Sequence, residues 1–123
     1  MKKVIFLAVI FCFASSLAPA ADIYTKELKG TIIDNLSVSS QKKPSDLAEF
    51  MKTYTKSSAL KPDSVASGYS IYMRGDLQKF DLASNPKIET FLKRDDSSLK
   101  VRVIVKKTDA GLHLIAIENQ KPN

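Results

Sequence analysis

The chain has 123 residues, of which 44% are apolar and 26% are charged, and its formal net charge at pH 7 is +6. A chain of this length builds one hydrophobic core, so two independent domains are excluded. The single cysteine excludes a disulfide framework and a thiolate metal site. The positive charge permits contact with acidic glycans, lipid head groups or nucleic acid, but it is too mild to require any of them.

The first twenty residues have the pattern of a bacterial secretory signal peptide. Lys2 and Lys3 form a positive segment, residues 4–13 are an uncharged apolar run, and Ala18-Pro19-Ala20 provides small residues for cleavage. The apolar run is too short to span a membrane, which takes about 20 residues. We therefore expect cleavage after Ala20 and a periplasmic or secreted product without a membrane span.

The expected mature chain, residues 21–123, contains no cysteine, because Cys12 lies within the apolar run. Large side chains, Ile10 and Phe11, precede Cys12, so we do not expect a lipid-anchored precursor. The remaining 103 residues include 17 basic and 13 acidic side chains. The stability of this single domain must come from packing alone.

The mature chain begins with a predicted strand. Residues 28–38 alternate between largely apolar even positions and polar odd positions, which is typical of a half-buried strand. Gly30 indicates a bulge or the close approach of another segment, and Asp34-Asn35 indicates a bend.

A helical insertion is predicted next. Residues 39–43 form a polar loop, and Pro44-Ser45-Asp46 is typical of a helix start, with Ser45 or Asp46 as the cap. Apolar residues then recur at helical spacing, at Leu47, Phe50, Met51 and Tyr54. Residues 55–67 are rich in Ser and Lys and are expected to form an irregular connection.

A hairpin and a second helix follow. Residues 68–73 and 77–82 are predicted strands, joined by a turn at Arg74-Gly75-Asp76. Asn85-Pro86 marks the start of a helix of about two turns, with Asn85 as the cap. Its single apolar stripe consists of Ile88, Phe91 and Leu92.

Two strands complete the domain. Val101, Val103 and Val105 alternate with Lys100, Arg102, Ile104 and Lys106, which is the clearest strand pattern in the chain. Residues 108–111 form a turn. Residues 112–118 are apolar on nearly both faces, so we expect this last strand to be central or covered.

The predicted fold is β-rich, between all-β and α+β. Five short strands, with a helix between the third and fourth and an insertion at about residues 40–67, have the element order of an OB-like barrel. Barrel closure would remove exposed edge strands. A flatter α+β sheet with two helices has the same order, and the order alone leaves both architectures open.

One segment resembles a known group of proteins. Residues 54–69 read Y-T-K-S-S-A-L-K-P-D-S-V-A-S-G-Y and resemble the segment H-T-K-x-C-A-L-x-P-x-C-V-x-S-G-Y of small exported bacterial proteins of unassigned function. The similarity extends to residues 30–34, residues 76–82 and the closing strand pair, and so to most of the mature chain. It implies an OB-like β domain and export rather than a particular activity.

The chain departs from this segment at three positions. Tyr54 stands in place of the histidine, and Ser58 and Ser64 stand in place of the two cysteines. Hydroxyl groups are poor ligands for soft or borderline metals and form no disulfides. The resemblance therefore implies no metal or redox role for this chain.

No catalytic centre is recognisable. His113, the only histidine, has no partner nucleophile or acid at a recognisable spacing, which favours a structural role. Asp95-Asp96 supplies too few oxygens for calcium and is expected to be a solvated helix end. Phosphate-binding loops, nucleophile elbows and metalloprotease motifs are absent from the sequence. We therefore expect no cofactor, no metal and no enzymatic activity.

Basic and aromatic residues of the predicted strands form the candidate ligand-binding set: Tyr72, Arg74, Lys79, Lys100 and Arg102. They lie on or beside elements that OB-like domains use to bind oligonucleotides or oligosaccharides. Alternating Lys and Arg also protect exposed strands from aggregation, which leaves a purely protective role open.

The leading hypothesis is an exported, non-enzymatic domain that binds an anionic or glycan-type ligand, such as an anionic envelope glycan, or a protein partner. Nucleic acid is not an expected partner. The alternative is a structural or envelope-maintenance protein without a specific small ligand, for which we expect no concave polar pocket. A hydrolase would require His113 to be exposed in a cleft beside a carboxylate or hydroxyl.

Overall fold

The computed structural model describes residues 25–121, and the predicted signal peptide lies outside this range. Within the range, five strands form one sheet in which every paired ladder is antiparallel. The strands are β1 (Thr25–Asp34), β2 (Tyr69–Met73), β3 (Asp76–Lys79), β4 (Lys100–Thr108) and β5 (Gly111–Asn119). Their spatial order is β3-β2-β1-β4-β5, so β1 lies at the centre.

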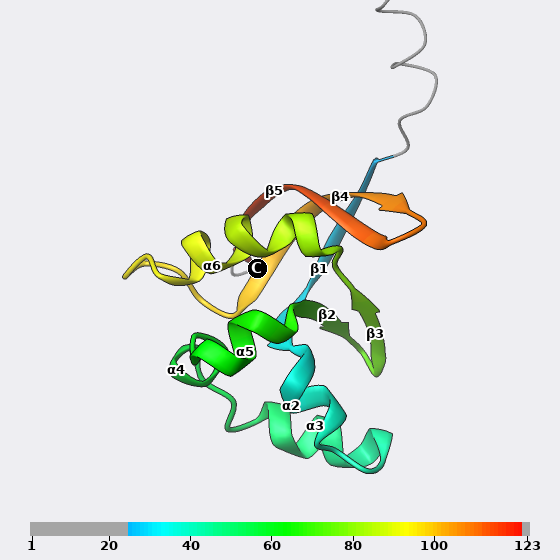
Figure 1. Cartoon of the computed structure of the whole chain (residues 1–123), viewed down its shortest axis with the longest axis vertical. Coiled ribbons are helices and arrows are strands. Elements are labelled where there is room, and N and C mark those ends of the chain that lie inside the picture. The colour runs from blue at the N-terminus through cyan, green and yellow to red at the C-terminus, as the bar shows by residue number, and fades with distance from the viewer. Residues whose placement is uncertain (1–24, 122–123) are drawn as a thin grey trace, which may run out of the picture.

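Helices occupy the two longer connections. Between β1 and β2 lie α2 (Asn35–Ser39), α3 (Pro44–Met51), α4 (Lys56–Ala59) and α5 (Pro62–Ser67). These four helices gather at one end of the sheet, whereas α6 (Asn85–Leu92) packs against β5 (Figure 1). The order of strands and helices agrees with the prediction, except that the insertion begins at Asn35 rather than near residue 40.

The sheet is open, so the predicted closed barrel is not confirmed. Its two edge strands approach each other at one end, where an isolated parallel bridge joins Phe80 to Leu112. There the amide of Asp81 donates to the carbonyl of Leu112 at 2.8 Å. β3 ends at Lys79 and forms no ladder with β5. The last strand was expected to be central or covered, and it lies at an edge of the sheet with α6 packed against it.

The core contains side chains from the strands, the insertion and α6. Val101, Val103 and Val105 are buried, as the alternation in β4 predicts. The apolar stripe of α6 is buried in the same cluster. Other members of the core are Ile32, Ile33, Leu47, Tyr54, Tyr69, Ile71, Phe80, Leu112 and Leu114.

The first strand ends at Asp34, so its predicted extension to residue 38 is wrong. The buried carboxylate of Asp34 accepts hydrogen bonds from the amide of Ser37 at 2.9 Å and from its hydroxyl at 2.8 Å. This side-chain cap satisfies a free amide at the start of α2 and turns the chain into a helix. Leu36 and Val38 consequently lie in α2 and not in the sheet.

The segment 55–67 is helical, which corrects its prediction as an irregular connection. The Thr55 hydroxyl caps α4 by accepting from the amide of Ser58 at 3.3 Å. α5 begins with Pro62, whose fixed φ suits the first helical position. The helix predicted from Pro44 is confirmed as α3, although no side chain caps it.

The hairpin turn has positive φ at Arg74 (49°) and Gly75 (85°), as a two-residue type I′ connection requires. β3 ends at Lys79, so the predicted strand to residue 82 is wrong at its end. Leu82 instead begins a 3₁₀ turn, η2 (Leu82–Ser84), and is 72% exposed.

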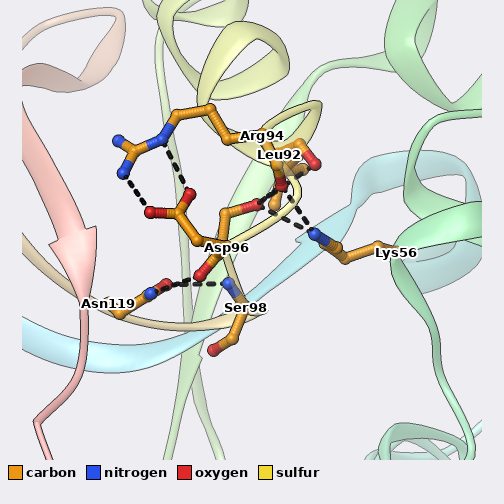
Figure 2. Close-up of polar contacts among 7 residues, drawn as sticks. Lys56, Leu92, Arg94, Asp96, Ser98 and Asn119 are labelled. Atoms are coloured by element: carbon orange, nitrogen blue, oxygen red, sulfur yellow. Dashed lines mark hydrogen bonds and ion pairs between the residues drawn. The ribbon is translucent and has the colours of Figure 1, made fainter.

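A polar cluster ties the insertion to the second half of the domain (Figure 2). The Lys56 ammonium of α4 donates to the carbonyl of Arg94 at 2.9 Å and to the hydroxyl of Ser97 at 3.0 Å, both after α6. The side-chain amide of Asn119, at the end of β5, donates to the carbonyl of Asp96 at 2.7 Å. This cluster connects α4, the loop after α6 and the last strand.

Candidate ligand-binding face

The strand register places four of the five predicted ligand-binding residues on one face of the sheet. Tyr72 is paired with Thr31, and Thr31 is paired with Lys100. Lys79 is paired with the residue two positions before Tyr72, and Arg102 lies two positions after Lys100. Paired residues share a face of the sheet, and so do residues two apart on one strand. Tyr72, Lys79, Lys100 and Arg102 therefore project to the same side.

Along β4 this side is opposite the core, because Lys100 and Arg102 alternate with the buried Val101 and Val103. Where the same side reaches Ile33 and Ser70, it is buried. Lys79 and Lys100 are exposed, and Tyr72 is half-buried. The fifth predicted residue, Arg74, is exposed in the hairpin turn and not on the strand face.

The charge of Arg102 is balanced within the protein. Its guanidinium contacts Glu118 at 2.6 Å and Glu27 at 3.2 Å. The hydrogen bond to Glu118 is the main cause that raises the pKa of Arg102 above its usual value. Arg102 is thus engaged by two carboxylates that sequence reasoning did not connect to it, since they lie on two other strands.

Lys29 is a member of this face that the sequence did not single out. It is exposed and lies directly opposite Arg102 in the register. Within residues 25–121, Lys29, Lys79 and Lys100 form no ion pair. The alternation in the first strand marks Lys29 as outward-facing, but the neighbouring strand could be identified only from the fold. We call the set Lys29, Thr31, Tyr72, Lys79, Lys100 and Arg102 the basic face.

A hollow of about 520 Å³ adjoins the basic face at Lys79. Its lining combines Asn35 and Ser67 of the insertion with Asp81 and Leu82 after β3. Asn35 is held in place because its side-chain amide donates to the carbonyl of Ser67 at 3.0 Å. The structural alternative predicts no concave polar pocket. This hollow is concave and partly polar.

His113 lies beside a carboxylate and is not buried. Its Nδ1 is 2.9 Å from Oδ2 of Asp81, and the His113 side chain is 40% exposed. The hydroxyl of Ser84, which shares Asp81 with His113, is buried and donates to Asp81 at 2.6 Å while accepting from the amide of Leu114 at 2.8 Å. This hydroxyl is therefore not placed as a nucleophile for His113.

Asp81 is the centre of that cluster. Its burial disfavours the charged form, but hydrogen bonds from Ser84 and His113 outweigh this effect and hold the pKa of Asp81 below its usual value. Since the amide of Asp81 also forms the contact between the two sheet edges, the cluster stabilises the region where the sheet approaches closure.

The three positions at which the chain departs from the resembling segment lie in the insertion. The Tyr54 hydroxyl donates to the buried carboxylate of Asp34, and burial is the main cause that raises the pKa of Tyr54, with this hydrogen bond second. Ser58 and Ser64 line a separate cavity. No group of three His, Cys, Asp or Glu side chains that could hold a metal ion occurs among the described residues.

Comparison of the chain with protein-family models, curated proteins and solved structures finds no match. The resemblance to small exported proteins therefore stays a prediction. Among the helices of residues 25–121, none has the length and apolar character needed to cross a membrane.

Proposed function

We propose that the chain is exported to the periplasm or beyond, and that its mature domain is a non-enzymatic module that binds an anionic, glycan-type ligand on the basic face. The observation that carries the proposal is the row formed by Lys100, Thr31 and Tyr72 across three neighbouring strands. It combines an exposed ammonium group that forms no ion pair within residues 25–121 with a half-buried hydroxyl and a half-buried aromatic ring on one side of the sheet.

The separation of the lysines favours an extended ligand. Lys79 on β3 and Lys100 on β4 are three strand intervals apart in the sheet order, which amounts to about 14 Å at the usual spacing of strands. Side chains that stand perpendicular to the sheet keep their ammonium groups at about this distance, which is too far for one small anion to contact both. A chain of several acidic sugar units can contact both, and its sugar rings can pack on Tyr72 between them.

The architecture supports an OB-like assignment as part of this proposal. The central position of β1, the helix between β3 and β4, and the parallel bridge from Phe80 to Leu112 are all features expected of an OB-like barrel that is incompletely closed. Barrels of this kind bind oligosaccharides or oligonucleotides over their second and third strands, which here contribute Tyr72 and Lys79.

Calorimetric titration with oligogalacturonate, a chain of acidic sugars, tests the proposal. The triple variant Lys29→Gln, Lys79→Gln, Lys100→Gln should bind at least about tenfold more weakly, since three charge contacts are lost. A charge-matched control, Lys42→Gln, Lys87→Gln, Lys107→Gln, changes three exposed lysines outside the basic face and should bind like the wild-type protein.

Equal weakening in both triple variants would contradict the proposal, because it would show that only net charge matters. Absence of binding to oligogalacturonate by the wild-type protein would favour the structural alternative. A neutral maltooligosaccharide of equal length completes the comparison and should bind more weakly than the acidic chain.

A further inference from the structure

A second cavity, separate from the basic face, lies within the helical insertion. It has a volume of about 400 Å³ and is lined by residues of α2, α3 and α4 and of the start of α5. Five of its eight lining side chains are serines. We call it the serine cavity.

The α2 serines present hydrogen-bond acceptors. The hydroxyl of Ser37 donates to Asp34 at 2.8 Å, that of Ser39 donates to the carbonyl of Leu36 at 2.8 Å, and that of Ser40 donates to the carbonyl of Ser37 at 2.7 Å. A hydroxyl has one proton and two lone pairs. Because each proton is already committed, a ligand meets these three groups as acceptors.

Donors come from α5 and its N-cap residue. Ser64 is only 5% exposed, yet its hydroxyl has no hydrogen-bond partner among residues 25–121. The hydroxyl oxygen is not sealed off from solvent, so its proton can be donated to a ligand in the cavity. Lys61 is exposed, lines the same cavity and forms no ion pair in the described part of the chain.

The remaining wall of the cavity is apolar, and its aromatic ring is held in place by packing. It consists of Phe50 and Leu36. The ring of Phe50 packs on that of Tyr54 with 5.5 Å between centroids. Tyr54 is itself held by its hydrogen bond to Asp34, so the aromatic surface is positioned before any ligand binds.

We infer that the serine cavity binds a single sugar unit, either neutral or carrying one carboxylate. The three acceptors of Ser37, Ser39 and Ser40 suit a ligand with several O–H or N–H donors, whereas a hydrogen phosphate dianion has only one. Lys61 disfavours a cationic ligand, and the Phe50 and Leu36 surface suits the C–H face of a pyranose ring. The cavity volume falls in the range of small-molecule sites.

Amide-resolved NMR titration of the protein with N-acetylglucosamine, glucuronate and inorganic phosphate tests the inference. At least one sugar should cause saturable shifts at Phe50, Ser58 and Ser64. Ser64→Ala should weaken that binding about fivefold, the usual effect of losing one hydrogen bond. The matched control Ser57→Ala changes an exposed serine that does not line the cavity and should leave the affinity unchanged.

The inference is overturned if neither sugar causes saturable shifts at these amides, if phosphate binds there more tightly than both sugars, or if Ser64→Ala titrates like the wild-type protein. The triple variant of Lys29, Lys79 and Lys100 should bind the sugar normally. Failure of the basic face and failure of the serine cavity are therefore distinguishable.

Discussion

Asp81 forms hydrogen bonds through both its side chain and its backbone. Its carboxylate accepts from Ser84 and His113, and its amide donates to the carbonyl of Leu112 on the opposite sheet edge. The sequence could not reveal this cluster, because Asp81 and His113 are 32 positions apart. The Asp34 cap could have been predicted from the sequence, since an acidic residue three positions before Ser37 is a helix-start pattern. The bend was predicted there, but the alternation up to residue 38 favoured a strand.

The lowered pKa of Asp81 predicts a pH-dependent contribution to stability. A carboxyl group whose pKa is depressed in the folded state stabilises that state above its ordinary pKa of 3.8, and the contribution is lost as pH falls through the folded value. Asp81→Asn should lower the free energy of unfolding by about 1–2 kcal/mol at pH 7. In urea denaturation from pH 7 to pH 2, the difference from the wild-type protein should shrink below about pH 4.

Asp109→Asn is the control for this measurement, because Asp109 is exposed in the turn between β4 and β5. It should change stability by less than about 0.5 kcal/mol. A difference between Asp81→Asn and the wild-type protein that stays constant down to pH 2 would contradict the role assigned to the ionised carboxylate.

Among the secondary-structure elements, those with a clear periodicity were predictable. The alternation of β4 and the apolar stripe of α6 each identify one buried face, and both faces are buried in the structure. α4 and α5 were not predictable, because four and six residues are too few to display a helical period. Their start signals, Thr55 and Pro62, are local and were outweighed by the polar composition of the segment.

The packing of β1 against β2 gives a second prediction. A Cβ atom at Gly30 would lie 2.6 Å from the carbonyl oxygen of Tyr72 and 2.6 Å from Cγ of Met73, which confirms the predicted close approach. Gly30→Ala should therefore lower the free energy of unfolding by about 2–3 kcal/mol, through overpacking. Equilibrium urea denaturation measures this change.

Gly75→Ala is the matched comparison. A Cβ there meets nothing within 4 Å, and only the positive φ of 85° opposes it. Its cost should be about 1 kcal/mol. Equal loss of stability in the two alanine variants would contradict the explanation that close contact with β2 requires glycine at position 30.

For the whole molecule, the sequence was sufficient for the order of the five strands, α3 and α6, but not for closure of the sheet. Element order follows from local patterns, whereas closure depends on how far β3 extends, and β3 stops at Lys79 where Asp81 caps the 3₁₀ turn. The basic face was likewise predictable from local patterns only in part. Its outward-facing residues follow from alternation within each strand, but the balancing of Arg102 and the participation of Lys29 depend on which strands are neighbours.

The central claim, that the basic face is the ligand-binding surface, is tested most directly by mapping amide chemical-shift changes during titration with oligogalacturonate. The changes should be concentrated at Lys29, Thr31, Tyr72, Lys79 and Lys100, and they should weaken as salt concentration rises, because charge contacts are screened. Saturable changes confined to α6 or to the far ends of β4 and β5, with these five amides unmoved, would contradict the account.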